Sequence, residues 1–145
     1  MGTFQARRPC IGPASITVMT PQLPLPAVRG RALGQRMETL ACQYLEHQGL
    51  LLRNRNYHAR YGELDLVMTD ANTCVFVEVR YRRHIQHGSP LDSVTTGKQQ
   101  RLILAARHYL MKFALDTPCR FDIVGLSGSA HAPNITWIRH AFDAC

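Results

Sequence analysis

Two acidic residues lie in the middle of apolar runs, where an ionised side chain is costly to bury. Asp65 belongs to the run GELDLVM, and Glu78 belongs to the run VFVEVR. Both runs have the composition of β-strands, and a carboxylate inside a strand needs an ion-pair partner, hydrogen-bond donors or a metal ion. Two such residues on consecutive strands therefore predict a site for a divalent cation.

The alternation of side chains along a strand determines whether these carboxylates can meet. Glu63 shares the strand face of Asp65, and Arg80 shares the strand face of Glu78. A hairpin between the two strands places Asp65 and Glu78 on the same side of a sheet if its register allows. Glu38, on a preceding helix, can supply a third carboxylate. Two or three carboxylates, with water and phosphate oxygens, suffice to bind Mg²⁺ or Mn²⁺.

These residue types suit the hydrolysis of a phosphodiester. A metal ion polarises the phosphate and lowers the pKa of a bound water, while Arg80 can neutralise the charge that develops on the phosphate. The alternative is structural, because either strand carboxylate can instead pair with Arg80, Arg82 or Arg120 across the sheet. For one carboxylate alone we favour pairing, but the two together with Glu38 favour a site. Asp122, in the apolar run RFDIV, is expected to be a structural partner of an arginine.

The charge of the chain is consistent with a nucleic-acid partner. Lys and Arg number 17 against 10 Asp and Glu, the net charge is +7, and 15 of the 17 basic residues are Arg. Arginine suits bidentate contacts with phosphate, although a GC-rich genome also favours arginine codons. The residues expected to contact a nucleic-acid backbone are Arg82, Arg83, Lys98 and Arg101.

Cysteine usage and hydropathy limit the compartment. The five cysteines form no CxxC pair, which favours reduced thiols over a zinc site or a disulfide framework. No apolar run approaches the roughly 18 residues of a membrane span, and the N-terminal segment lacks a signal-peptide core. We therefore expect a cytoplasmic protein that does not contact a membrane.

Proline distribution divides the chain into two parts. Residues 1–30 contain five of the eight prolines and show no periodicity, which predicts a flexible leader. Translation can start at Met1 or at Met19, and the sequence does not decide between them. Residues 31–145 are expected to form one domain.

Periodicity within that domain predicts an α/β fold. Helices are expected over residues 31–48 and 95–114, and strands over 50–58, 63–69, 74–82, 120–126 and 134–142. The first three strands can form an antiparallel meander, and the second helix can cross over to a fourth strand parallel to the third. The order α-β-β-β-α-β-β therefore predicts a mixed five-stranded sheet flanked by helices, in three layers.

Several motifs between about Gly34 and Phe142 also carry a resemblance. They are GQRMETLACQYLEHQGL, GELDLVM, VFVEVRYRR, the Gly88–Lys98 loop leading into KQQRL, CRFDIV and WIRHAF. In this order they resemble the YraN family of uncharacterised bacterial proteins. That family in turn resembles the restriction-endonuclease-like fold, which includes resolvases of Holliday junctions and is marked by PD-(D/E)xK motifs.

The resemblance implies a role for particular residues. Glu38 matches the helix Glu of that superfamily, Asp65 matches the strand Asp, and Glu78 matches the carboxylate of the Glu-x-Lys pair. Arg80 stands where the Lys is expected. Arginine stays charged and cannot act as a general base, so either the water needs no protein base, or Lys98 takes part of the role, or the chain binds without cutting.

Three functions follow as hypotheses. The first is a metal-dependent endonuclease that uses Mg²⁺ or Mn²⁺ and acts on DNA, with branched DNA and a homodimer suggested by analogy alone. The second is a nucleic-acid-binding module on the same fold without catalytic activity. The third is a scaffold or processing factor whose partner is another protein.

Overall fold

The computed structural model describes residues 30–84 and 88–143. In order along the chain, the elements are α1 (Gly30–His47), β1 (Leu51–Ala59), β2 (Gly62–Asp70), β3 (Thr73–Arg82), the 3₁₀ helix η1 (Pro90–Ser93), α2 (Thr96–Lys112), β4 (Cys119–Ser127) and β5 (Asn134–Phe142). The leader predicted over residues 1–30 falls almost entirely outside the described residues.

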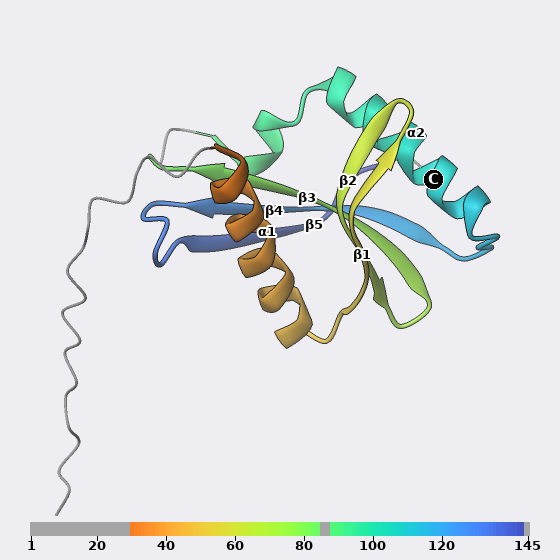
Figure 1. Ribbon diagram of the computed structural model, residues 1–145, viewed down its shortest axis with the longest axis horizontal. Helices are drawn as coiled ribbons and strands as arrows, with labels where there is room; N and C mark the ends of the chain where they lie inside the picture. The colour runs from red at the N-terminus through yellow and green to blue at the C-terminus, as the bar shows by residue number, and fades with distance from the viewer. Residues whose placement is uncertain (1–29, 85–87, 144–145) are drawn as a thin grey trace, which may run out of the picture.

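The five strands form one mixed sheet in the order β1-β2-β3-β4-β5. Strands β1, β2 and β3 are an antiparallel meander, β4 runs parallel to β3, and β5 is antiparallel to β4. The connection between β3 and β4 passes through α2, as a parallel pair requires. The predicted α/β fold, with its mixed five-stranded sheet and flanking helices, is confirmed (Figure 1).

Helix α1 covers one face of this sheet. Its buried residues Met37, Ala41 and Leu45 recur at helical spacing and pack in one core with Leu66 and Val77 of the sheet. Burying each large aliphatic side chain contributes about 1.5–3 kcal/mol. This core fixes the position of α1, and with it the position of Glu38.

Helix α2 covers the opposite face. Leu102, Ala106 and Tyr109 pack in a second core with Phe76 and Phe121 of the sheet. Successive residues of a strand point to opposite faces, so the two cores lie on opposite sides of the sheet. The result is the predicted three-layer arrangement (Figure 1).

The short helix η1 lies between the predicted strand 74–82 and the predicted helix 95–114, and periodicity did not reveal it. Ser89 accepts a hydrogen bond from the backbone of η1, and the Asp92 carboxylate accepts one from the Ser89 N–H at 2.7 Å. Gly125 lets η1 lie directly on β4, because a Cβ there would stand 2.3 Å from Cγ of Pro90. A capping box and a missing side chain therefore position η1.

Two further expectations concern the compartment. Cys42 and Cys74 are free and buried, as expected for reduced thiols, but Cys119 is disulfide-bonded, so the expectation of reduced thiols alone is wrong. The connectivity of cysteines depends on the fold and cannot be deduced from their spacing. Among the described residues, no helix is both long enough and apolar enough to span a bilayer.

Candidate active site

Strands β2 and β3 separate at the two carboxylates that the sequence singled out. Their pairing runs from Asp70 opposite Thr73 to Leu66 opposite Val77 and stops there. Beyond this last pair, the next residue is Asp65 on β2 and Glu78 on β3. The Asp65 Oδ2 atom accepts a hydrogen bond of 2.9 Å from the backbone N–H of Val79, so a side chain takes the place of a ladder partner. The separation leaves room between the strands for carboxyl groups.

Strict alternation fails near this separation. A regular strand would place Leu64 on the same face as Leu66 and Met68. It packs instead in the core under α2, whereas Leu66 and Met68 pack under α1. At its beginning, β2 is paired only with β1, and Asn56 of β1, which lies opposite Asp65 between the pairs Arg55–Leu66 and Tyr57–Leu64, has a positive φ of 48°. Strict alternation does not continue across such irregular pairing.

Glu78 lies at the centre of the site and is 4% exposed. Its Oε1 atom is 3.4 Å from Nζ of Lys98 and 3.5 Å from Nη1 of Arg80. Its Oε2 atom is buried without a hydrogen-bond partner among the described residues. Burial, and next the charge of Asp65, raise the pKa of Glu78 to about 8, although Lys98 and Arg80 oppose the rise.

Asp65 is the second member of the carboxyl pair. Burial raises its pKa, while the Val79 N–H and a hydrogen bond from Glu78 favour its ionised form. Two carboxyl groups in contact disfavour double ionisation, so the raised pKa of Glu78 predicts that the pair holds one proton near neutral pH in the free protein. A hard divalent cation is the other way to satisfy four carboxyl oxygens here, and these donors fit one.

Glu38 approaches this pair from α1 but does not complete a three-carboxylate cluster. Burial raises its pKa, the charge of Asp65 raises it further, and a hydrogen bond with Asn56 lowers it. It lines a hollow of about 510 Å³ together with Asn56, His58 and Glu63. Within the described part of the chain, no three His, Cys, Asp or Glu side chains group closely enough to hold a metal ion. The structure thus brings Asp65 and Glu78 together and leaves Glu38 beside them.

The basic residues of the site come from β3 and α2. Arg80 donates from Nε to Oγ of Ser93 and from Nη2 to the Ser93 carbonyl, each at 3.1 Å, which fixes its guanidinium beside Glu78. Lys98 lies in the first turn of α2, whose N-cap is Thr95. Helix α2 in turn approaches β2 closely, because a Cβ on Gly62 would lie 2.7 Å from a backbone oxygen of α2.

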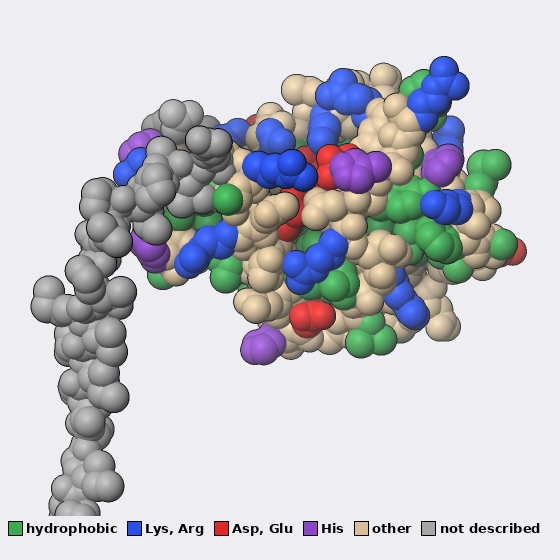
Figure 2. Space-filling view, viewed as in Figure 1, with side chains coloured by type: hydrophobic (Ala, Val, Ile, Leu, Met, Phe, Trp, Pro, Cys, Tyr) green, Lys and Arg blue, Asp and Glu red, His purple; other side chains and the backbone are tan. Residues whose placement is uncertain are grey.

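The other predicted basic residues lie around this centre. Arg82 is half-buried near the end of β3, whereas Arg83 and Arg101 are exposed. None of the three has an ion-pair partner within residues 30–84 and 88–143. Figure 2 shows Asp and Glu side chains near the middle of one face, with Lys and Arg side chains around them.

Asp122 shows what a purely structural carboxylate looks like in this fold. It accepts hydrogen bonds from Nε of Arg120 at 3.1 and 3.2 Å, from Nε1 of Trp137 at 3.0 Å and from the His140 N–H at 3.1 Å. Arg120 also binds Asp70 at 2.9 Å. The expectation for Asp122 is confirmed, and Arg120 is engaged away from the Asp65–Glu78 pair.

Sequence reasoning missed Ser93 and Asn56. Ser93 anchors Arg80, and Asn56 stabilises the ionised form of Glu38. The capping box of Ser89 and Asp92 was a signal for η1, which ends at Ser93. No sequence pattern marked Asn56, because its hydrogen bond with Glu38 depends on β1 passing beside α1 in the folded protein.

Comparison with known proteins decides the family. The family described as "Uncharacterised protein family UPF0102" matches residues 37–126, more than half of the chain. The chain belongs to the UPF0102 family. This confirms the resemblance to YraN proteins that the motifs carried.

Individual UPF0102 proteins are similar over most of their length. One from Nitrosococcus oceani is 52% identical over 114 residues, which cover 77% of this chain and 92% of the relative. One from Chromohalobacter salexigens is 50% identical over 114 residues, covering 79% and 93%. One from Pseudomonas putida is 50% identical over 122 residues, covering 82% and 99%.

The matched UPF0102 segment contains the whole carboxylate site. It begins one residue before Glu38, includes both strand carboxylates and Lys98, and ends at Leu126 in β4. Strand β5 lies outside it. The site therefore belongs to the part of the chain by which the family is defined.

Proposed function

We propose that this UPF0102 protein is a metal-dependent endonuclease that hydrolyses phosphodiester bonds of DNA. The observation that carries the proposal is the contact of half-buried Asp65 with buried Glu78. Oε2 of Glu78 lacks a hydrogen-bond partner among the described residues, while Lys98 and Arg80 approach its Oε1 atom. An unsatisfied pair of this kind is costly to the fold. A site that binds a cation and a phosphate would explain why the fold keeps this destabilising pair.

Different residues would bind the metal and the phosphate. Asp65 and Glu78 would hold Mg²⁺ or Mn²⁺, with Glu38 beside them adding negative charge. When bound, the metal would supply Lewis acidity and a more acidic water. The guanidinium of Arg80, held by Ser93 at 3.1 Å, would bind a phosphate oxygen and stabilise its developing charge.

Lys98 is our candidate for the role that an arginine at position 80 leaves unfilled. Its Nζ atom is 3.4 Å from Glu78, so a lysine reaches the carboxylate from α2 instead of from β3. It can orient Glu78 and donate a hydrogen bond to a phosphate oxygen or to the attacking water. We therefore assign to Lys98 the role that the Glu-x-Lys pattern gives to its lysine.

Cleavage of labelled DNA tests the proposal. Duplex, single-stranded and four-way-junction DNA would each be incubated with Mn²⁺ or Mg²⁺, and the junction would show whether branched DNA is preferred. Asp65→Ala should abolish metal-dependent cleavage. Asp116→Ala, which removes an exposed carboxylate elsewhere in the chain, is the matched control and should cleave like the wild type. Equal cleavage by the wild type and Asp65→Ala would refute the assignment.

A second function is favoured by one specific observation. The three carboxylates do not form a group that holds a metal by itself. A nucleic-acid-binding module without catalysis would then use the same basic residues. It predicts that neither the wild type nor Asp65→Ala cuts DNA, and that both bind it equally and in a salt-dependent way.

A further inference from the structure

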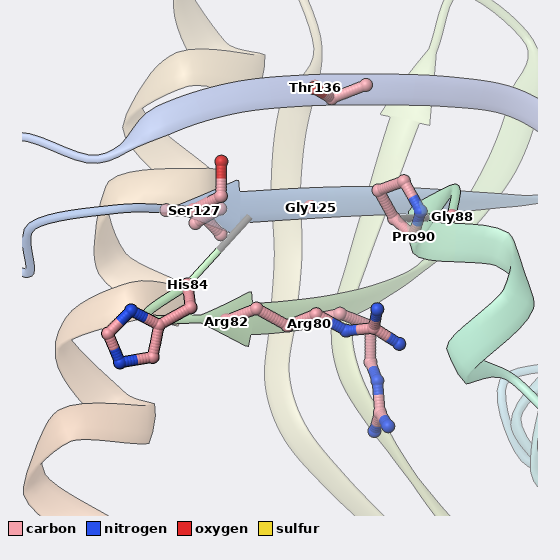
Figure 3. A pocket seen from close by; sticks show the side chains of 9 residues that line it. Arg80, Arg82, His84, Gly88, Pro90, Gly125, Ser127 and Thr136 are labelled. Atoms are coloured by element: carbon pink, nitrogen blue, oxygen red, sulfur yellow. The ribbon is translucent and has the colours of Figure 1, made fainter. Parts of the chain in front are cut away.

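A hollow of about 150 Å³ lies next to the carboxyl pair, on the sheet surface that α2 leaves uncovered. It is bordered by Arg80, Arg82 and His84 of the β3 side, by Pro90 of η1, and by Ser127 and Thr136 of β4 and β5. Figure 3 shows Arg80, Arg82, Ser127 and Thr136 on neighbouring strands, with His84 beyond the end of β3 and Pro90 on η1 beside β4. Arg80 therefore borders both the hollow and Glu78.

The walls of this hollow are held in place by specific contacts. Pro90 lies against β4 at Gly125, where any side chain would collide with it. The Ser93 hydroxyl donates to the Pro90 carbonyl at 2.6 Å, and Arg80 donates to Ser93. Ligand sites are usually pre-formed, because side chains that are already fixed lose little conformational entropy when a ligand binds.

The chemistry of the lining favours an anion. Among the residues that the structure describes, no acidic side chain borders the hollow, and the carboxylate of Asp92 in η1 is turned to the Ser89 N–H. Within the described residues, the Arg82 guanidinium has no ion pair, and the hydroxyls of Ser127 and Thr136 have no hydrogen-bond partner. One guanidinium and two hydroxyls are the donors that proteins present to a phosphate.

We propose that this hollow binds the phosphodiester next to the one that lies at Asp65 and Glu78. The nucleic-acid backbone would then cross the C-terminal ends of the parallel strands β3 and β4 and reach the start of β5, with Arg80 between the two phosphates. This inference rests on the proposed function, because it takes the carboxyl pair as the place of the scissile phosphate. It adds a contact that the family match, which ends in β4, does not include.

Replacing one phosphate at a time by an uncharged methylphosphonate tests the assignment. Binding of a short labelled DNA would be followed by fluorescence anisotropy in metal-free buffer, where no cleavage occurs. For the wild type, we expect one position beside the scissile phosphate at which the replacement weakens binding about tenfold. In Arg82→Ala the same replacement should have no further effect. Arg107→Ala, which removes an exposed arginine of α2, should keep the wild-type sensitivity.

Variants of Thr136 test the hollow without modified DNA. Thr136→Glu should weaken binding, and Thr136→Lys should strengthen it. Gln43→Glu adds the same negative charge on exposed α1, over the opposite face, and should change affinity far less than Thr136→Glu. Thermal unfolding would confirm that each variant is folded.

The outcomes separate this inference from the nuclease proposal. If the wild type never cuts DNA but Arg82→Ala removes the sensitivity at one phosphate, the hollow is the phosphate site and the nuclease fails. If the wild type cuts DNA but Arg82→Ala keeps every sensitivity, the nuclease stands and the hollow is refuted. Equal affinities of Thr136→Glu and Gln43→Glu would refute it as well.

Discussion

The protonation of the Asp65–Glu78 pair links stability to function at the scale of single residues. The free protein keeps a proton on Glu78, whose pKa is raised to about 8, first by burial and then by the charge of Asp65. Binding a divalent cation would displace that proton. The same four oxygens would therefore lower the stability of the free fold at high pH and supply the affinity for the metal.

Glu78→Gln should make the fold less sensitive to pH. Between the ordinary pKa of 4.5 and about 8, the folded wild type binds a proton that the unfolded chain releases, so its stability falls as pH rises through this range. A glutamine cannot ionise. In metal-free buffer at pH 8, the variant should be more stable by at least about 1 kcal/mol, the equivalent of one pKa unit.

Urea unfolding at pH 5 and pH 8 measures this difference. Glu46→Gln is the matched control, since Glu46 is exposed on α1 and should follow the wild type at both values. A free energy of unfolding for Glu78→Gln that falls with pH as steeply as that of the wild type would contradict the assignment of the proton.

Lys98 should affect the chemistry through its charge near Glu78. Its Nζ atom is 3.4 Å from the carboxylate, and its charge opposes the rise in the pKa of Glu78. Lys98→Met keeps the length of the side chain and removes the charge. It should raise the pKa of Glu78 further and lower kcat by about 10²–10³, the size of effect seen when a donor to a developing charge is lost.

Two measurements check the role of Lys98. Carbon-detected NMR titration of Glu78 reports its pKa whether or not the protein is an enzyme, and single-turnover cleavage reports the chemical step. Arg107→Ala, which removes an exposed arginine of α2, is expected to leave both quantities near their wild-type values. An unchanged Glu78 titration in Lys98→Met would show that the lysine does not act on this carboxylate.

At the scale of elements, periodicity identified every regular helix and strand, and β5 was predicted at its observed bounds, 134–142. Alternation along β2 and β3 correctly placed Asp65 and Glu78 together. It failed at Leu64, because the separation of β2 from β3 is a tertiary event that no local pattern encodes. Helix η1 was missed because four residues are too few to show a period.

Gly125→Ala should disturb the site through η1 without replacing a charged residue of the site. The added Cβ would lie 2.3 Å from Cγ of Pro90, so η1 must move away from β4 and carry Ser93 with it. Arg80 would then lose its anchor. We expect a loss of about 1–3 kcal/mol in the free energy of unfolding, typical of overpacking, together with weaker DNA binding.

The control for this variant is Gly34→Ala on α1. A Cβ at Gly34 would meet nothing within 4 Å, so the substitution should be neutral or stabilise the helix by about 0.5–1 kcal/mol. Thermal unfolding and anisotropy with labelled DNA measure both quantities. If Gly125→Ala is as stable as Gly34→Ala, η1 does not depend on this close approach.

At the scale of the whole molecule, some carboxylates have a full set of partners and the Asp65–Glu78 pair does not. The carboxylates with complete partners, Asp122 and Asp70, hold β4 and β5 to the sheet through Arg120 and Arg139. The carboxyl pair without complete partners lies where β2 and β3 separate. Around it lie Arg82, Arg83 and Arg101, which have no ion pair within the described part of the chain. Evolutionary selection for stability alone would not leave that arrangement. On the proposed function, a metal ion would balance the carboxyl pair and the phosphates of a nucleic acid would balance the arginines.

The salt dependence of DNA binding tests this view of the molecule and separates it from the protein-scaffold hypothesis. With a net charge of +7, the chain should release counterions from each phosphate that it neutralises. The logarithm of the association constant should therefore fall linearly with the logarithm of salt concentration, and removing one phosphate contact should reduce the slope by about one. Arg82→Ala and Arg101→Ala should each do so, whereas Arg107→Ala should keep the wild-type slope. A scaffold for another protein would bind DNA weakly, and the three substitutions would then change the slope equally, since each removes one charge from the surface and none removes a contact.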